Sequence, residues 1–176
     1  PEHYRSLLEK LSRTMAIGVL LRDRDGGRVT VDREGNPVAH YALSEFDRGH
    51  LRRGFIGAAR ILEAAGASLI FSPHAKWCSY EPGKNGTLES FTQSMDEAGW
   101  ESGRVALFSF HIMGSARLGG SAKTSATKPN GETWEVRRLY VMDGSSFPSA
   151  SGVNPMISIE AIAHHNAREL AGQTAG

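Results

Sequence analysis

The sequence is poor in cysteine, in net charge and in long apolar runs, and each shortage excludes a class of protein. A single cysteine, Cys78, excludes an internal disulfide and a zinc site of several cysteines, and we expect it to be a structural or surface thiol. The formal net charge of +1 leaves no strong basic surface for nucleic acid. No apolar run approaches the ~20 residues that a helix needs to cross a bilayer. The 176 residues are enough for one domain with a core, or for parts of two.

Several common fingerprints are also missing. No G-x-G-x-x-G occurs, so the chain lacks the strand–turn–helix that grips a dinucleotide pyrophosphate. No G-x-S-x-G occurs, so an α/β-hydrolase would lack its nucleophile. The Gly-rich segment 114–125 has no Gly directly before Lys123 and no clear apolar strand–helix frame, which excludes the phosphate loop of a nucleotide triphosphatase. No His pair at metal-ligand spacing has a third partner, so we expect no metal site.

The N-terminal region begins with a helical pattern that gives way to short apolar runs bounded by turns. Residues 2–13 predict a short amphipathic helix. Strand-like segments follow at Ala16–Arg22, Arg28–Asp32 and Val38–Leu43, and Gly-rich turns separate them. We therefore expect an antiparallel meander after the first helix.

The following region combines helices with one further strand. Ser44 with Asp47 resembles a capping box, and the apolar spacing after it predicts a long helix from about Glu45 to Ala65. Residues 67–72 read as a strand, and residues 88–98 as a short helix inside a polar stretch. Strands and helices in this order predict a mixed α/β fold.

The C-terminal region places an apolar strand, a turn and a helix in a row. Leu139–Met142 is a short run of strand type that Asp143-Gly144 ends. Asn154 is a good helix N-cap, and Pro155 is the residue best tolerated at the first helical position. Apolar residues then recur at helical spacing: Met156, Ile159, Ile162, Ala163, Ala167 and Leu170. Such a helix start favours anions, for example the charged edge of a reduced flavin, although an ordinary capped helix packed on a sheet explains the same residues.

Three motifs in their order and separation resemble the C-terminal part of the glucose–methanol–choline (GMC) oxidoreductases. They are His-x-x-Gly-Ser at His111–Ser115, 'LYVMDGS' at Leu139–Ser145 and 'GVNPMISI' at Gly152–Ile159. Within that family, residues 130–156 are most similar to the long-chain-alcohol oxidase branch. The segment 'LLRDRDGGRV', which begins at residue 20, resembles the same branch more weakly.

The resemblance implies how the chain is divided. Residues 1–105 would be a portion of a substrate-binding domain with an antiparallel sheet. Residues 106–176 would be a C-terminal segment, containing a strand and a helix, that completes a Rossmann-like FAD-binding domain. The family's FAD-binding fingerprint lies near the N-terminus of the full protein and is absent here. We therefore expect this chain to be the C-terminal fragment of a larger protein.

Alcohol oxidation needs a base for the hydroxyl proton and an acceptor for the hydride on carbon. Protein side chains accept hydride poorly, so a cofactor such as a flavin has to do so. Histidine suits the first role because its ordinary pKa, about 6.5, lies near working pH. His111 is the candidate, in an apolar run that ends in a Gly-Ser turn. A lone histidine in such a run is usually a core residue, but the resemblance identifies this one as the family's catalytic histidine.

The resemblance also assigns roles around the second motif. Asn154 matches a family position, His or Asn, that hydrogen-bonds the substrate oxygen, and asparagine cannot serve as a base. Asp143 and Gly144 would lie on the ribityl–pyrophosphate side of FAD. Asn154, Pro155 and Met156 would lie at the flavin.

These inferences give a predicted function with two alternatives. The predicted function is FAD-dependent oxidation of the CH–OH group of a long aliphatic alcohol to an aldehyde, with O2 or another electron acceptor. One alternative is a non-catalytic remnant or interaction domain without the FAD-binding half. The other is a different branch of the family, such as a sterol oxidase or an acceptor-linked alcohol dehydrogenase.

Overall fold

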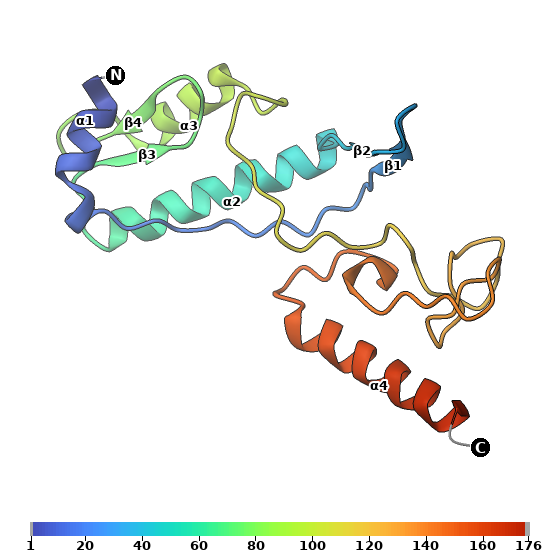
Figure 1. Ribbon diagram of the computed structural model, residues 1–176. Helices are drawn as coiled ribbons and strands as arrows, with labels where there is room; N and C mark the ends of the chain where they lie inside the picture. Colours follow the sequence, from blue (N-terminus) through green and yellow to red (C-terminus); the bar gives the residue numbers. More distant parts are fainter. Residues whose placement is uncertain (1, 175–176) are drawn as a thin grey trace.

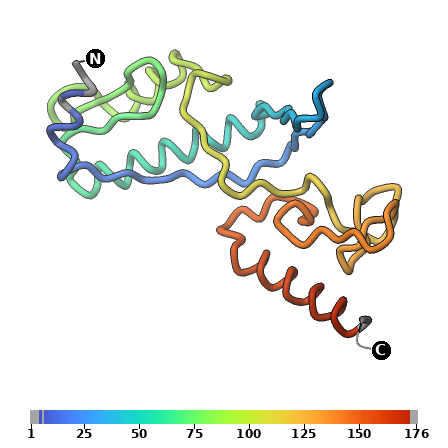
Figure 2. The backbone as a smooth tube through the Cα atoms, viewed as in Figure 1, coloured from blue at the N-terminus to red at the C-terminus, as the bar shows by residue number. Residues whose placement is uncertain are grey.

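The computed structural model describes residues 2–174, and these fold into two parts joined by extended segments (Figure 1, Figure 2). The first part contains the hairpins and helices up to α3, and the second contains the loops around a short 3-10 helix, η2, together with α4. In chain order the elements are α1 (Glu2–Glu9), η1 (Leu11–Arg13), β1 (Arg28–Val31), β2 (Pro37–His40), α2 (Glu45–Ala64), β3 (Ile70–Ser72), β4 (Cys78–Tyr80), α3 (Leu88–Ala98), η2 (Gly144–Ser146) and α4 (Met156–Thr174). The fold is mixed α/β with small antiparallel sheets, as predicted.

The hydrophobic core belongs to the first part, where the β3–β4 hairpin and α3 pack against α2. Ile70 pairs with Tyr80 in the hairpin, and the Tyr80 ring lies 5.0 Å from that of Phe91 on α3. Cys78 is buried, and its Sγ donates to the carbonyl of Ser94 at 3.4 Å, so it is a structural thiol. The buried members of the core are Ala59, Ile70, Cys78, Tyr80, Phe91, Met95 and Ala98.

The N-terminus of α2 is fixed by a buried carboxylate. Ser44 is the N-cap and accepts from the backbone N–H of Asp47 at 3.2 Å. The Asp47 side chain, which is 0% exposed, accepts from the backbone N–H groups of Arg24 (3.0 Å) and Asp25 (3.3 Å) and from the Ser44 hydroxyl (2.8 Å). Burial raises the pKa of Asp47, but these hydrogen bonds outweigh it and hold the pKa below its ordinary value. The residues before α2 are therefore tied to the start of this helix.

The predicted strand Ala16–Arg22 is wrong, because this segment is extended but pairs with no strand. Its residues alternate between half-buried and exposed from Ile17 to Arg22. Val19 lies over Gly54 of α2, where a Cβ would come within 2.4 Å of the Val19 Cγ1. The burial of side chains alternates here because one side of the extended segment packs, in part against α2. The meander is accordingly a two-stranded hairpin, in which Arg28 pairs with His40.

The predicted strand Leu139–Met142 is also absent as a full strand. Tyr140 forms an isolated antiparallel bridge with Glu132, and the Val141 N–H donates to the Gly131 carbonyl at 2.9 Å. The ladder stops there because Gly131 turns the partner segment away, with a φ of 86°. The order of the predicted pieces is nevertheless kept, since this segment leads through η2 into α4.

Candidate active site

A tight turn at residues 143–147 organises the second part. The Asp143 carboxylate caps η2 by accepting from the Ser145 N–H at 2.8 Å, and the Ser145 hydroxyl donates to the same oxygen. Backbone carbonyls of this turn also accept hydrogen bonds from the segment that follows the His111 motif. The Ala116 N–H donates to the Ser145 carbonyl at 3.0 Å, and the Leu118 N–H donates to the Ser146 carbonyl at 2.9 Å. The histidine-bearing segment is therefore pinned to this turn.

Gly144 is the point where this segment meets α4. A Cβ on Gly144 would lie 3.2 Å from the Ile112 carbonyl oxygen and 3.3 Å from the Ile159 Cδ1. Ile112 follows His111 directly, and Ile159 belongs to the first turn of α4. The backbone beside His111 and the start of α4 therefore both lie next to Gly144.

His111 is half-buried in an extended segment between the two parts. Within residues 2–174, its imidazole has no hydrogen bond or ion pair, so both ring nitrogens remain open to a ligand. Its neighbours Phe108, Phe110 and Ile112 are 79%, 83% and 72% exposed, so the apolar setting expected around it is not formed by these residues packing inward. Gly114 takes a φ of 81°, which turns the backbone after the histidine as predicted.

Asn154 lies exposed just before α4, and its predicted N-cap role is wrong. The helix begins at Met156, and the Pro155 carbonyl accepts the first helical hydrogen bond, from the Ile159 N–H at 2.9 Å. The N-cap position is therefore occupied by Pro155, whose ring is buried. Asn154 lies one residue outside the cap.

The loop before Asn154 is held from the other part of the molecule by Arg22. The Arg22 Nε donates to the Ala150 carbonyl at 3.1 Å. Gly152 has a φ of 73°, and a Cβ there would come within 2.9 Å of the Arg22 Cδ. No local sequence pattern indicates this role for Arg22, because its partner lies 128 residues along the chain.

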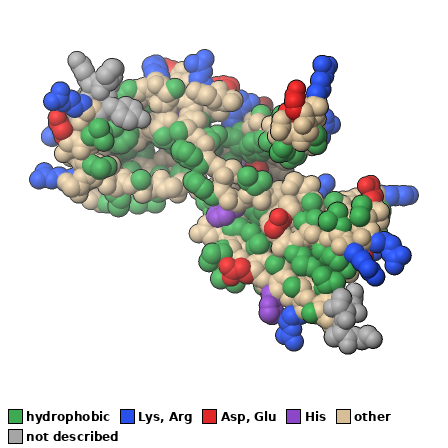
Figure 3. All heavy atoms as spheres, in the orientation of Figure 1, with side chains coloured by type: hydrophobic (Ala, Val, Ile, Leu, Met, Phe, Trp, Pro, Cys, Tyr) green, Lys and Arg blue, Asp and Glu red, His purple; other side chains and the backbone are tan. Residues whose placement is uncertain are grey.

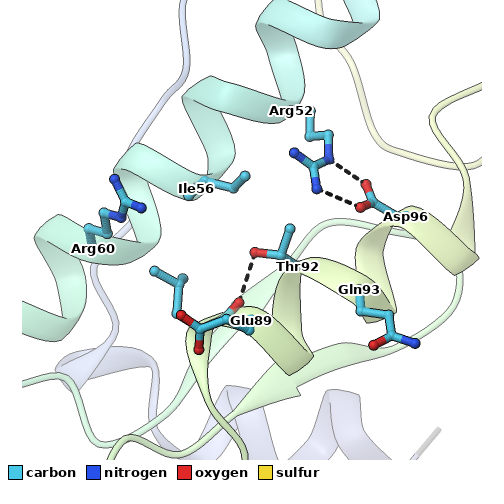
Figure 4. A pocket seen from close by; sticks show the side chains of 8 residues that line it. Arg52, Ile56, Arg60, Glu89, Thr92, Gln93 and Asp96 are labelled. Atoms are coloured by element: carbon cyan, nitrogen blue, oxygen red, sulfur yellow. Dashed lines mark hydrogen bonds and ion pairs between the residues drawn. The ribbon is translucent and has the colours of Figure 1, made fainter.

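Two hollows of about 360 Å³ each mark the surface. One hollow lies between α2 and α3, where Arg52 makes a bidentate ion pair with Asp96 at 2.7 Å (Figure 4). Neither predicted catalytic residue lines this hollow. The other is lined by Gly114 and Ser115 of the histidine motif and by the polar loop after it. Figure 3 shows apolar side chains on the outer surface of both parts of the molecule.

The described residues contain no group of three His, Cys, Asp or Glu side chains placed to hold a metal ion. Nor does any helix among residues 2–174 combine the length and apolar character needed to cross a membrane.

The backbone beside His111 and the start of α4 thus meet at one glycine turn in a mixed α/β fold. Residues 23–163 match the family described as GMC oxidoreductase, and the chain belongs to the GMC oxidoreductase family. The resemblance found in the three motifs is therefore confirmed.

Characterised relatives agree with the branch expected from the sequence. Two long-chain-alcohol oxidases of Arabidopsis thaliana are 36% and 35% identical, covering 92% and 88% of this chain but only 22% and 21% of their own length. A 2-methyl-1,2-propanediol dehydrogenase of Mycolicibacterium austroafricanum is 41% identical over 54 residues, which are 31% of this chain and 10% of that protein. The chain thus spans about one fifth of the Arabidopsis relatives.

The fold also resembles that of a solved oxidase structure. The crystal structure of pyridoxine 4-oxidase from Mesorbium loti superimposes with a TM-score of 0.57 at 18% identity, covering 85% of this chain and 28% of that one. This likeness concerns the fold alone.

Proposed function

We propose that this chain is the C-terminal, catalytic portion of an FAD-dependent enzyme that oxidises the CH–OH group of long-chain aliphatic alcohols to aldehydes. Residues 1–105 form a portion of its substrate-binding domain, and residues 106–176 complete its FAD-binding domain. The observation that carries the proposal is the packing of the His111 segment and the start of α4 on Gly144. The Arabidopsis relatives support the substrate class, because they are long-chain-alcohol oxidases and their similarity extends over nearly the whole of this chain.

FAD is the general cofactor of the family, and the residues present fit it. Gly144 lets the Ile112 carbonyl and Ile159 of α4 pack closely against it, and the first N–H groups of α4 are donors for an anionic ring edge. Val153, Met156 and Ile157 are 66%, 62% and 69% exposed at the same helix start, which offers a flat ring an apolar surface. Of the remaining residues expected at the cofactor, Asp143 and Asn154 supply polar groups, whereas Pro155 has no N–H and supplies position only.

In the proposed reaction the neutral His111 imidazole accepts the hydroxyl proton of the alcohol. The Asn154 side-chain amide donates a hydrogen bond to the same oxygen and stabilises the charge that develops there. When bound, FAD would supply the acceptor for the hydride on that carbon, and O2 or another electron acceptor would be the final oxidant. Because His111 has no protein partner among the described residues, no internal hydrogen bond has to break before it accepts the proton.

The test is anaerobic stopped-flow reduction of the flavin in the full-length protein with 1-dodecanol, from pH 5 to 9. We expect His111→Ala to lower the limiting rate about 10²- to 10⁴-fold with FAD content unchanged, as removal of a general base does. The wild-type rate should rise with pH through one ionisation, since only neutral imidazole accepts a proton, and the variant should lose this dependence. His165→Ala, an exposed position on α4, is the matched control. A His111→Ala variant with the wild-type rate and pH profile would make His111 a structural residue.

A further inference from the structure

We propose that Arg22 is a positioning residue for Asn154, acting through the loop that precedes α4. The inference rests on the proposed function, because it concerns the hydrogen bond from Asn154 to the substrate oxygen. Arg22 belongs to the first part of the molecule and Asn154 to the second. A side chain that joins the two parts can fix where the amide lies relative to a substrate bound between them.

Arg22 is held in place on both sides along the chain. Three residues before it, Val19 sits in the notch that Gly54 leaves in α2. Two residues after it, the Arg24 N–H donates to the buried Asp47 carboxylate at 3.0 Å. The backbone of Arg22 is therefore fixed to α2 although it belongs to no helix or strand.

The Arg22 side chain grips the loop by one polar and one apolar contact. Its Nε donates to the Ala150 carbonyl at 3.1 Å. Its aliphatic part lies over Gly152, where a Cβ would come within 2.9 Å, 3.0 Å and 3.2 Å of the Arg22 Cδ, Cβ and Cγ. Ala150 and Gly152 precede Asn154 by four and two residues, so Arg22 contacts the loop just before Asn154 along the chain.

Asn154 depends on this grip because its own side chain has no hydrogen bond within residues 2–174. On its C-terminal side, buried Pro155 fixes the backbone. On its N-terminal side, the Ser151 hydroxyl donates to the Val153 carbonyl, which holds the loop to itself and not to the rest of the molecule. The bond from Arg22 ties this side of the loop to the first part, and small displacements at a reacting centre have large effects on rate.

Two variants of nearly equal shape separate the hydrogen bond from the packing. Arg22→Gln places an amide N–H where the Arg22 Nε was, and Arg22→Met places a methyl carbon at the same position. In stopped-flow flavin reduction of the full-length protein, we expect Arg22→Met to lower the limiting rate about 3- to 10-fold, as loss of one net hydrogen bond does. Arg22→Gln should stay near the wild-type rate. Arg33→Met, at an exposed turn of the β1–β2 hairpin, is the control and should change nothing.

The decisive measurement is the double variant with Asn154→Ala. If Arg22 acts through Asn154, Arg22→Met should slow the enzyme no further once the amide is gone, with FAD content unchanged in every variant. Wild-type rates in Arg22→Met, equal slowing by Gln and Met, or the full loss appearing again on top of Asn154→Ala would each overturn the inference. Should Arg22→Met be too unstable to measure, Arg22→Lys, which also lacks the Nε donor, is expected to match its slowing. A wild-type flavin that no alcohol reduces would instead overturn the proposed function.

Discussion

Replacing Asp47 by asparagine tests the link between α2 and the segment that carries Arg22. The carboxylate is fully buried and accepts three hydrogen bonds, two of them from the backbone N–H groups of Arg24 and Asp25. An asparagine side chain keeps one oxygen, which can serve Arg24. Its NH2 group would then face the Asp25 N–H, so a donor would stand against a donor.

The magnitude follows from the bonds lost. A hydrogen bond to a charged group contributes about 1.5–3 kcal/mol, and an unpaired buried donor adds to the loss, so we expect about 2–4 kcal/mol in local stability. Hydrogen–deuterium exchange of the full-length protein reports this directly, in peptides that contain the Arg24 and Asp25 amides. Since every 1.4 kcal/mol is tenfold, their exchange should accelerate about 30-fold to several-hundred-fold in Asp47→Asn.

Acid provides a second check on Asp47. Its pKa lies below the ordinary value of 3.8, so the stability it contributes is present above that value and is lost as pH falls through the lower, folded-state pKa. Asp47→Asn should lack this acid-dependent loss. The control is Glu45→Gln, an exposed acid on the same helix turn that should leave the amides unchanged. Unaltered exchange at Arg24 and Asp25 in Asp47→Asn would refute the reasoning.

Three further predictions concern the rest of the chain. His74 is buried with its Nε2 unpaired, and burial lowers its pKa despite the nearby Asp96. Thermal stability should therefore fall as pH drops below about 6.5, because the unfolded state takes up the proton first. His74→Gln should flatten this slope in melting curves followed by tryptophan fluorescence, whereas exposed His165→Gln should not. Arg52→Ala should lower stability by only about 1 kcal/mol in the same melts, because its ion pair with Asp96 is partly exposed, and a loss above about 3 kcal/mol would contradict this. Residues 1–176 purified alone should be colourless and inactive, and should aggregate through exposed apolar surface; a bound-flavin absorption spectrum would contradict it.

The parts of the fold that depend on nearby residues could be predicted from the sequence. The α3 helix has the predicted bounds, and α2 begins at the predicted cap, because capping and helical periodicity are local. The errors arose where a distant partner decides the structure. An alternating pattern predicted a strand at Ala16–Arg22, but alternation shows only that one side packs, and here Val19 packs on a helix. A distant partner also decides the structure of Leu139–Met142, which forms no full strand because its partner segment turns away at Gly131.

For the candidate site, motifs located the residues and the structure supplied the arrangement. His111 and Asn154 were found because their neighbours match a known family pattern. The meeting of their two segments at Gly144 could not be predicted, since it depends on the carbonyl of Ile112 and the side chain of Ile159 both lying against that glycine. Arg22 gave no signal at all, because its partner is a backbone carbonyl, and any residue can supply one.

The notch at Gly54 predicts that two distant positions of the chain change together during evolution. Glycine inside a helix is less stable than alanine by about 1 kcal/mol, so selection would replace it unless something occupied the space. Val19 occupies that space, with its Cγ1 only 2.4 Å from where a Cβ would stand. A lineage can therefore enlarge position 54 only after position 19 has become smaller, and the two should vary together among homologues. Val19 lies three residues from Arg22, which in turn contacts the loop before Asn154. A substitution at position 19 or 54 is therefore expected to shift the region around Asn154, although neither residue is proposed to contact a substrate.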